Sequence, residues 1–513
     1  MTPRQTVAIL DFGSQYTKLI ARRIREHAVY SEILPYSTTA DRLSGDNIAA
    51  IVLSGGPASV FGDEAPQLDP AIMALGKPIL GICYGLQAML HLAGASVQTN
   101  GSGEYGQAQL LIDSAGTLFD GLEGSIPVWM SHGDRVENVP ADWEVLAHSD
   151  NGIVGAARHR QLPFYGTQFH PEVDHTPDGR AILANFLFGV AGCKADWTAE
   201  YQVAHLSGRI RTQVGDERVL CALSGGVDSA VLAALLNRVL GDRVSCVFID
   251  HGLLRKNEAQ QVGTTLEAGL GLKINRYDYS AIFLRSLEGV VEPEKKRQII
   301  GREFIRAFEE VARKSEPARF LAQGTLYPDV IESGAGPGMA QTIKSHHNVG
   351  GLPRDLGFEL LEPLRELFKD EVRNLGRELG LPEEILMRHP FPGPGLAVRI
   401  LGEVTPQRLA ILREADAIYQ EILLATGEYQ RIWQAFAVLL PVQTVGVMGD
   451  QRTYDNVIAL RAVTSTDGMT ADWYRMPPDV LGQISSRIVN AVQGVNRVVY
   501  DITAKPPGTI EWE

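Results

Sequence analysis

The chain has 513 residues, of which 45% are hydrophobic and 21% are charged, so it is long enough for about three soluble domains. Its net charge of −14 argues against a protein that coats nucleic acid, but is compatible with a local basic pocket for an anionic substrate. No apolar stretch reaches the ~20 residues of a membrane helix, and we expect no signal peptide. The four cysteines (Cys83, Cys193, Cys221 and Cys246) form no C-x-x-C pair, so we expect reduced thiols and a cytoplasmic protein.

Short apolar strands alternate with helices in the first part of the chain. Strands are predicted at Val7–Leu10, Ile48–Leu53 and Pro78–Ile82, with helices that reach Arg25 and cover Leu86–Leu92. This alternation predicts a doubly wound, parallel α/β sheet. Ligand-handling residues gather at the carboxyl ends of the strands in such a sheet, so the loop after each strand is a candidate site.

Cys83 lies between a predicted strand and a predicted helix, with Gly81 and Gly85 on either side. This pattern is typical of the sharp turn that exposes a nucleophile above a sheet. A helix N-terminus also favours the thiolate form of cysteine. The alternative is a buried structural cysteine, which is the fate of most free cysteines.

A thiol nucleophile needs a base and a group that orients the base. If the segment around His170 is extended, the side chains of His170 and Glu172 project to the same side, so the carboxylate can hold the imidazole tautomer that faces the thiol. A histidine beside a proline is otherwise more often structural. The segment Ser54–Pro57 can supply backbone N–H groups for an oxyanion, although the segment taken by itself predicts only a turn.

Together, the segments Ser54–Pro57, Gly81–Gln87 and Phe169–Val173 resemble the class I glutamine amidotransferase family. The resemblance implies that the side-chain amide of glutamine is hydrolysed through a thioester on Cys83, which releases ammonia. It also implies an oxyanion hole formed by the backbone amides of Gly56 and Tyr84.

A second α/β region follows a boundary near residues 192–198. Further strands are predicted at Arg218–Leu223, Val244–Ile249, Lys273–Tyr277 and Ala318–Leu321. The predicted domains are therefore residues 1–196, 197–388 and 389–513.

The third domain begins with His389–Gly395, which is too rich in proline and glycine for regular structure. A helix is predicted at Pro406–Ala425 and β-like runs at Thr444–Met448, Val457–Val463 and Arg497–Ile502. These elements predict a smaller α+β domain.

The segment Ser224–Ser229 follows a strand and opens a helix, which is a favourable anion site. It lacks the lysine of a Walker A motif. Asp228 would repel phosphate unless it binds a divalent ion, and Mg²⁺ characteristically bridges carboxylate and phosphate oxygens. We therefore expect Mg²⁺ as cofactor, with Asp228 as its ligand.

This segment resembles the pyrophosphate loop of the ATP pyrophosphatases, a group that includes NAD, asparagine and argininosuccinate synthetases. The resemblance implies an adenine-nucleotide α-hydrolase-like domain that adenylates a substrate and releases pyrophosphate. The implied ATP-binding residues are Ser224, Gly225, Gly226, Val227, Asp228, Ser229 and Ala230. Lys369 lies where a mobile lysine reaches the ATP phosphates, and an exposed helix lysine is the alternative.

Finer matches at Gln323–Ser333, Lys344–Gly351, Leu367–Arg373, His389–Gly395 and Lys505–Glu513 resemble the GMP synthase family over essentially the whole chain. The resemblance implies that XMP, ATP and glutamine yield GMP, AMP, pyrophosphate and glutamate through an adenylated XMP. It also implies a C-terminal domain that forms a homodimer and completes the XMP site.

The implied XMP contacts are Arg297, Asp450, Lys505 and Glu511. The charge run of Lys295, Lys296, Arg297 and Arg302 can meet a nucleotide phosphate, although such a run is more often a solvated helix face.

Other functions fit the same residues less well. A glutamine-dependent NAD synthetase usually has an amidase without this Cys–His–Glu order, and asparagine synthetase uses an amino-terminal cysteine, whereas Thr2 follows Met1 here. CTP synthase has a similar amidotransferase at the other end of its chain. A non-enzymatic nucleotide sensor is disfavoured because Cys83, His170, Glu172 and Asp228 are all present.

Overall fold

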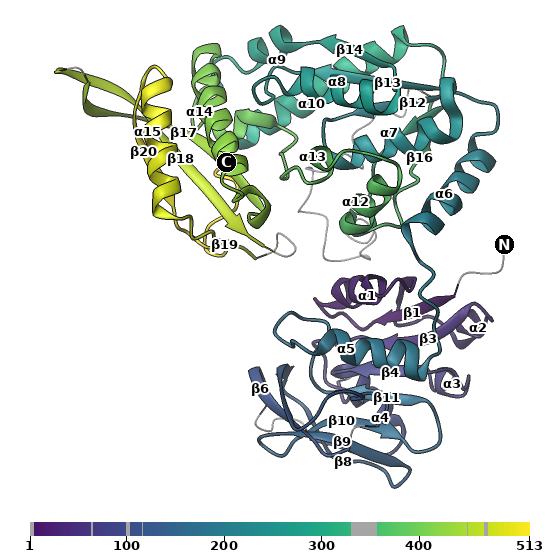
Figure 1. Ribbon diagram of the computed structural model, residues 1–513. Helices are drawn as coiled ribbons and strands as arrows, with labels where there is room; N and C mark the ends of the chain where they lie inside the picture. Colours follow the sequence, from purple (N-terminus) through teal and green to yellow (C-terminus); the bar gives the residue numbers. More distant parts are fainter. Residues whose placement is uncertain are drawn as a thin grey trace. The chain divides into compact units, whose positions relative to one another are not determined.

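A computed structural model describes residues 5–62, 65–98, 103–114, 116–329, 357–448, 450–465 and 470–513. The chain divides into two compact units, Met1–Tyr201 and Gln202–Glu513 (Figure 1). The predicted boundary after residue 196 lies close to this division, and the boundary after residue 388, which lies inside the second unit, stays a prediction. Two predicted motif segments, 330–333 and 344–351, lie outside the described residues. Among the described residues, no helix combines the length and the apolar composition of a membrane span.

The first unit is built on a mixed sheet with the strand order β2-β1-β3-β4-β11-β10-β9-β6-β7. Its strands are β1 (Thr6–Asp11), β2 (Ser31–Pro35), β3 (Ile48–Leu53), β4 (Ile79–Ile82), β6 (Glu104–Ile112), β7 (Ser125–His132), β9 (Trp143–Ser149), β10 (Val154–His159) and β11 (Phe164–Thr167). The strands from β2 to β11 pair in parallel, and those from β11 to β7 pair antiparallel. The strands β5 (Ser96–Gln98) and β8 (Arg135–Asn138) form a separate ribbon.

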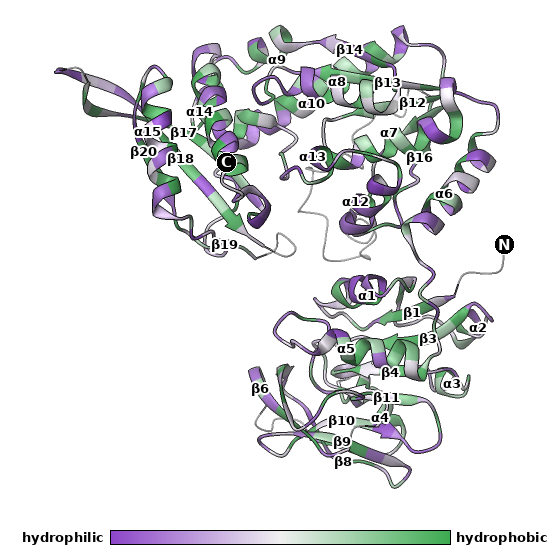
Figure 2. Cartoon of the chain, in the orientation of Figure 1, coloured by the Kyte–Doolittle hydropathy of each residue, from purple (hydrophilic) through white to green (hydrophobic). Residues whose placement is uncertain are grey.

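The helices of this unit are α1 (Thr17–Glu26), α2 (Ala40–Leu43), α3 (Pro70–Met73), α4 (Tyr84–Leu92) and α5 (Gly179–Ala184), which continues into the π-helical turn η1 (Asn185–Val190). The parallel strands form continuous apolar runs, seen as green arrows in Figure 2, because helices cover both faces of such a sheet. Strand β6, at the antiparallel end, instead carries exposed residues between its buried ones.

The second unit contains a parallel sheet with the strand order β14-β13-β12-β15-β16. Its strands are β12 (Val219–Leu223), β13 (Val244–Asp250), β14 (Ile274–Asp278), β15 (Phe320–Ala322) and β16 (Glu359–Leu361). The chain moves from β12 to β14 on one side and then returns to the other side of β12. The carboxyl end of β12 is therefore the switch point at which ligands bind in such folds.

The helices around this sheet are α6 (Ala199–Val214), α7 (Val227–Leu240), α8 (Glu258–Leu270), α9 (Ser280–Ser286), α10 (Pro293–Lys314), α12 (Lys369–Glu378) and α13 (Glu383–Leu386). Helix α7 contacts α12 and α13, whereas α10 contacts α9 and the 3₁₀ turn η4 (Gly395–Arg399). Turn η4 ends the proline- and glycine-rich segment and leads into the C-terminal region.

The C-terminal region is an α+β layer in which helices α14 (Pro406–Ala425) and α15 (Pro478–Ala491) pack on a small sheet. The sheet comprises β17 (Gln434–Met448), β18 (Gln451–Thr464), β19 (Asp472–Trp473) and β20 (Val495–Asp501), and the turn η5 (Tyr429–Arg431) precedes it. One hydrophobic cluster runs from Leu220 of the parallel sheet to Val495 of the C-terminal sheet. The predicted α/β class and the α+β C-terminal region are confirmed.

Candidate active sites

Cys83 occupies a strained turn between β4 and α4. Its backbone has φ 52° and ψ −105°, a conformation that a residue with a side chain rarely adopts. A Cβ at Gly81 would lie 2.6 Å from the backbone carbon of Gly85, and a Cβ at Gly85 would lie 2.4 Å from the carbonyl oxygen of Leu53. Only glycine fits at either position, so the two glycines allow the turn that presents the thiol.

His170 and Glu172 form a buried pair beside this thiol. The His170 Nδ1 lies 2.7 Å from the Glu172 Oε1, and the Glu172 side chain is fully buried. Burial lowers the pKa of His170, but the charge of Glu172 and the hydrogen bonds that the ring shares with Cys83 and Glu172 outweigh it and raise the pKa well above its usual value. The pair therefore favours an imidazolium next to the nucleophile, as a thiolate requires.

The base and the nucleophile both lie close to Gly55, in the loop after β3. A Cβ at Gly55 would lie 3.2 Å from the His170 Cε1 and 3.7 Å from the Cys83 Cβ. The structure thus brings together all three segments that were predicted to form the thiol site. Their catalytic roles stay predictions.

The backbone groups predicted for the oxyanion hole lie on the same two loops. Tyr84 is the first residue of α4, and the first N–H groups of a helix have no intrahelical acceptor. A Cβ at Gly56 would lie 2.6 Å from the carbonyl oxygen of Phe12, so this loop packs against the end of β1. This geometry is compatible with an oxyanion hole, which no contact in the structure tests.

Sequence reasoning missed several residues that hold the thiol site. The Gln168 Nε2 donates to the Cys83 Sγ at 3.6 Å, and that sulfur lies 3.7 Å from the Ser131 carbonyl oxygen. The buried Arg23 donates from Nε to the Glu172 carbonyl oxygen at 2.9 Å. The burial of Arg23 appears only in the fold, so the sequence offered no signal for this contact.

The predicted phosphate loop links β12 to α7 at the switch point of the second unit. Gly225 has φ 80°, and Gly226 is the N-cap of α7. The Ser229 hydroxyl lies 3.2 Å from the Ser224 amide and 3.1 Å from the Ser224 hydroxyl, so it closes the loop on itself. The open helix N-terminus that results can bind an anion through N–H groups.

Asp228 and Lys369 meet at this loop. The Lys369 Nζ lies 2.6 Å from both carboxylate oxygens of Asp228. Among the described residues, no group of three or more His, Cys, Asp or Glu side chains converges to hold a metal. A single carboxylate that shares Mg²⁺ with phosphate oxygens is nevertheless the usual arrangement in nucleotide enzymes, so Asp228 fits the ion.

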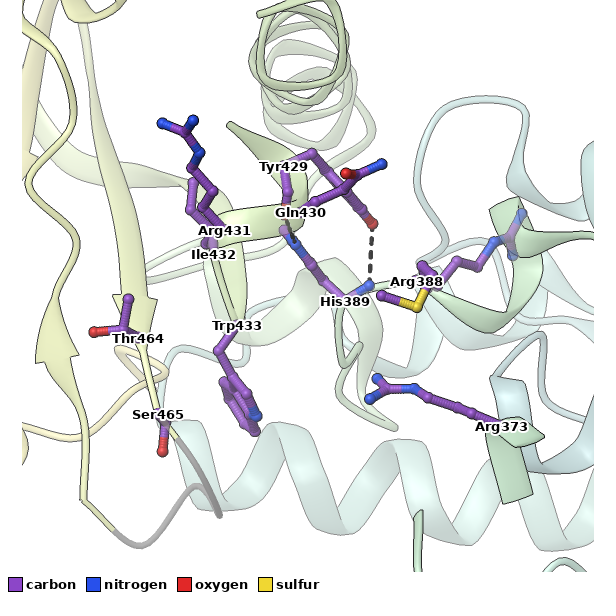
Figure 3. A pocket seen from close by; sticks show the side chains of 11 residues that line it. Arg373, Arg388, His389, Tyr429, Gln430, Arg431, Ile432, Trp433, Thr464 and Ser465 are labelled. Atoms are coloured by element: carbon purple, nitrogen blue, oxygen red, sulfur yellow. Dashed lines mark hydrogen bonds between the residues drawn. The ribbon is translucent and has the colours of Figure 1, made fainter. Parts of the chain in front are cut away.

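A cavity of about 260 Å³ lies between α12 and the start of the C-terminal region, and three arginines line it: Arg373, Arg388 and Arg431 (Figure 3). His389 stacks on Tyr429 at its wall, with ring centroids 3.7 Å apart. The Arg388 Nη1 donates to the Gly225 carbonyl oxygen at 3.3 Å, so this basic cavity borders the phosphate loop.

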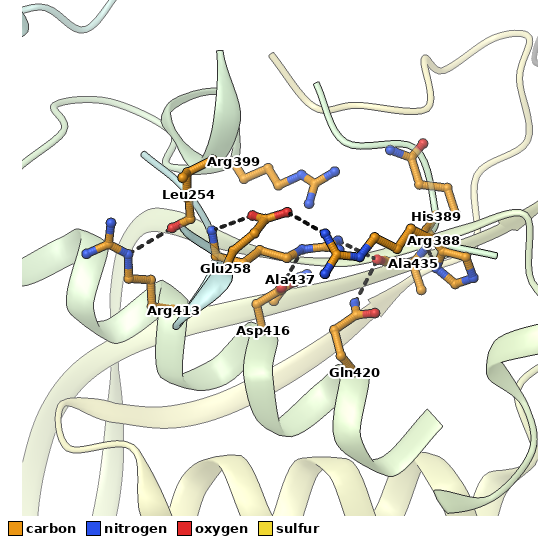
Figure 4. Close-up of polar contacts among 12 residues, drawn as sticks. Leu254, Glu258, Arg388, His389, Arg399, Arg413, Asp416, Gln420, Ala435 and Ala437 are labelled. Carbon is orange, nitrogen blue, oxygen red and sulfur yellow. Dashed lines mark hydrogen bonds and ion pairs between the residues drawn. The ribbon is translucent and has the colours of Figure 1, made fainter. Parts of the chain in front are cut away.

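A polar network ties the loop after β13 to the C-terminal region (Figure 4). The Arg255 Nε lies 3.0 Å from the Asp416 Oδ2, and the Asp416 Oδ1 accepts from the Ala437 amide at 3.0 Å. Glu258 accepts from the Arg255 amide at 3.0 Å and lies 3.8 Å from Arg388. The phosphate loop is therefore linked to the C-terminal sheet through this network, because Arg388 contacts both Gly225 and Glu258.

The predicted XMP residues fall into two groups. The Glu511 carboxylate accepts from Arg399 and from the Gln434 Nε2, and Arg297 donates to the backbone oxygen of Glu513. Lys505 pairs with Ala471 through the backbone, near the end of β18. These three positions belong to one region of the second unit.

Asp450 lies in the other group. It occupies the turn between β17 and β18 with φ 65°, whereas Lys505 lies near the opposite end of β18. A strand of this length spans roughly 40 Å. Within one chain, Asp450 therefore cannot share a site with Lys505.

The charged residues predicted as one run on α10 also differ in burial and in partners. Lys296 is fully buried, whereas Lys295 is exposed and pairs with Glu292. Arg302 is exposed and pairs with Glu303. Lys296 is thus not available to a nucleotide phosphate.

Known protein families match the N-terminal and the C-terminal parts of the chain. Residues 8–190 match the family model for glutamine amidotransferase class-I, and residues 421–512 match that for the GMP synthase C terminal domain. Glutamine-hydrolysing GMP synthase of Chlorobium phaeovibrioides is 56% identical, covering 99% of this chain and 100% of the relative. The chain belongs to the glutamine-hydrolysing GMP synthase family.

Further members of the GMP synthase family align equally well. The enzyme of Thermosynechococcus vestitus is 55% identical over 99% of this chain and 97% of its own length. That of Carboxydothermus hydrogenoformans is 56% identical over 99% of each chain. The predicted family is therefore confirmed.

Proposed function

We propose that this chain makes GMP from XMP, with Cys83 releasing ammonia from glutamine in the first unit and the phosphate loop activating XMP in the second. As a member of the GMP synthase family, the chain is a ligase that takes its amido nitrogen from glutamine. The observation that carries the residue assignment is the union in one chain of a strained cysteine turn with a buried His–Glu pair, and a Ser-Gly-Gly-Val-Asp-Ser loop at a sheet switch point.

In the first unit, the Cys83 thiolate attacks the side-chain amide carbon of glutamine. The protonated His170 transfers its proton to the departing nitrogen, so ammonia leaves and a thioester to Cys83 remains. His170 then takes a proton from water, which attacks the thioester and yields glutamate. Glu172 holds the imidazole through the 2.7 Å contact to Nδ1, which leaves Nε2 for the proton transfer.

In the second unit, N–H groups at the start of α7 bind the β- and γ-phosphates of ATP. The O2 of XMP attacks the α-phosphorus, and pyrophosphate leaves. Ammonia then attacks C2 of the adenylated XMP, and AMP leaves with the oxygen. When ATP binds, Lys369 leaves Asp228 and neutralises negative charge on the phosphates. Mg²⁺ bound by Asp228 would supply further charge neutralisation to the pyrophosphate group.

The XMP assignment is supported by Arg297 and Glu511, together with Lys505, in one region of the second unit. A homodimer is supported by exposed apolar side chains on the C-terminal sheet, such as Val447 and Tyr454, which are 76% and 57% exposed. A cytoplasmic location is supported by the four cysteines, which are all unpaired thiols.

The proposal is tested by GMP formation from XMP, ATP and Mg²⁺ with either glutamine or ammonium as nitrogen source. Cys83→Ala should lose the glutamine reaction and keep the ammonium reaction, because only the first needs the thioester. If the variant still uses glutamine, Cys83 is not the nucleophile. If the unchanged chain forms no GMP from either source, the proposed function is wrong.

A further inference from the structure

Three fully buried cations converge on the last segment of the sequence, Thr503–Glu513. They are Lys296 of α10, Arg399 of η4 and Arg461 of β18, and the side chain of each is 0% exposed. The three come from separate elements of the second unit. A buried charge needs a partner, so the contacts of these side chains show what holds them.

The tail supplies partners to all three cations. Lys296 pairs with the Glu513 carboxylate and donates to the carbonyl oxygens of Ile400 at 2.7 Å and Ala397 at 3.3 Å.

Arg399 binds Glu511 through two contacts, Nη2 to Oε1 at 2.8 Å and Nε to Oε2 at 3.1 Å. Arg461 pairs with Asp501 of β20 at 3.2 Å, and it donates to the carbonyl oxygens of Thr503 at 2.5 Å and Thr509 at 3.1 Å in the tail. We call these three cations and their partners in the segment Thr503–Glu513 the tail clamp.

The tail clamp adjoins the residues assigned to XMP. Arg297, next to Lys296, donates to the backbone oxygen of Glu513, so α10 and the tail are joined at two successive residues. Glu511, two residues before Glu513, is held by Arg399. A buried ion pair stabilises a fold little compared with apolar packing, whereas it specifies one geometry.

We propose that Lys296 and Glu513 are positioning residues, which hold Arg297 and Glu511 at the spacing that XMP binding requires. This inference rests on the proposed function, because it takes the XMP site from there. Lys296 acts through its neighbours, since it is fully buried and does not reach a substrate. Loss of either partner removes one of the two contacts between α10 and the tail, so Arg297 and Glu511 no longer lie at the spacing that XMP binding requires.

The test compares Lys296→Met and Glu513→Gln with Lys314→Met in the full-length chain. Lys314 lies on the same helix and forms an exposed pair with Glu310, so it controls for loss of a lysine from α10. The measurements are kcat and the KM for XMP in the ammonium-dependent reaction, with the thermal unfolding midpoint. Because Glu513→Gln keeps an oxygen that accepts from Lys296, it is the milder variant and preserves folding if Lys296→Met does not.

We expect both clamp variants to raise the KM for XMP about tenfold or more and to change kcat less than about threefold, with the KM for ATP unchanged. Lys314→Met should change none of these values. A KM for XMP within about twofold of the unchanged chain in Glu513→Gln and in folded Lys296→Met overturns the inference, whatever the midpoint does. If the unchanged chain does not aminate XMP, the proposed function itself fails, so the two failures are distinguishable.

Discussion

Gly55 offers the sharpest test of the thiol site, because a single methyl group added there would lie against both the base and the nucleophile. Its backbone is outside the left-handed region, so alanine can adopt the same conformation. The added Cβ would lie 3.2 Å from the His170 Cε1 and 3.7 Å from the Cys83 Cβ. The first distance is a few tenths of an ångström below an ordinary carbon–carbon contact of about 3.5–4.0 Å.

The imidazole has little room to accommodate the methyl group. Its Nδ1 is held by Glu172 at 2.7 Å, and the ring of Tyr16 lies edge-on to it with centroids 5.1 Å apart. We expect the ring to move by about 0.3–0.5 Å. A displacement of about 1 Å in an active site costs roughly 10²-fold in rate, so Gly55→Ala should slow the glutamine-dependent reaction about tenfold.

The assay measures GMP formation with glutamine and with ammonium at saturating XMP and ATP. Gly55→Ala should slow the first and leave the second unchanged, because the second does not use the thiol. Gly208→Ala is the matched control, since a Cβ at Gly208 meets nothing within 4 Å and its backbone is not left-handed. A glutamine rate within about threefold of the unchanged chain, or an equal loss in both reactions, refutes the reasoning.

Three further predictions follow from named contacts. Glu172→Gln should reduce the rate of the glutamine reaction by about 10³–10⁴-fold and spare the ammonium reaction, because the amide holds the wrong tautomer of His170. A glutamine rate equal to that of the unchanged chain would show that Glu172 does not orient the base. Lys369→Met should raise the KM for ATP with either nitrogen source by about tenfold or more, and a lowered KM would instead mean that Lys369 only masks Asp228. Burial lowers the pKa of His389 to about 4 from 6.5, so the unfolded chain binds more protons between these values and stability rises with pH there, by up to about 3 kcal/mol. His389→Gln should flatten this dependence in urea unfolding followed from about pH 4 to pH 7, and an unchanged slope would contradict it.

Local structure could be predicted from the sequence where residues adjacent along the chain determine it. The helix predicted at Pro406–Ala425 has those bounds in the structure, because the Thr405 hydroxyl accepts from the Arg408 amide and proline occupies the first turn. The glycines around Cys83 likewise predicted its turn. Strand β17 was predicted only over Thr444–Met448, since its first half is a continuous buried run without the alternation of a half-exposed strand.

Contacts between segments that are far apart along the chain could not be predicted from the sequence. Lys295 and Lys296 are indistinguishable in the sequence, yet one is exposed and the other is fully buried against Glu513. Asp450 and Lys505 were grouped through family resemblance, and the length of β18 separates them. No periodicity of one segment encodes such pairings, because they depend on where another segment packs.

Three local features of the candidate sites could be predicted from the sequence alone: a thiol on a glycine-flanked turn, a His–Glu pair two residues apart, and a phosphate loop at a helix start. Each of these depends on a few consecutive residues, whose backbone preferences act locally. Folding, by contrast, places Gly55 against both His170 and Cys83 and pairs Lys369 with Asp228. It also decided that three buried cations hold the tail, because the cost of burying a charge is met only by groups that folding brings together.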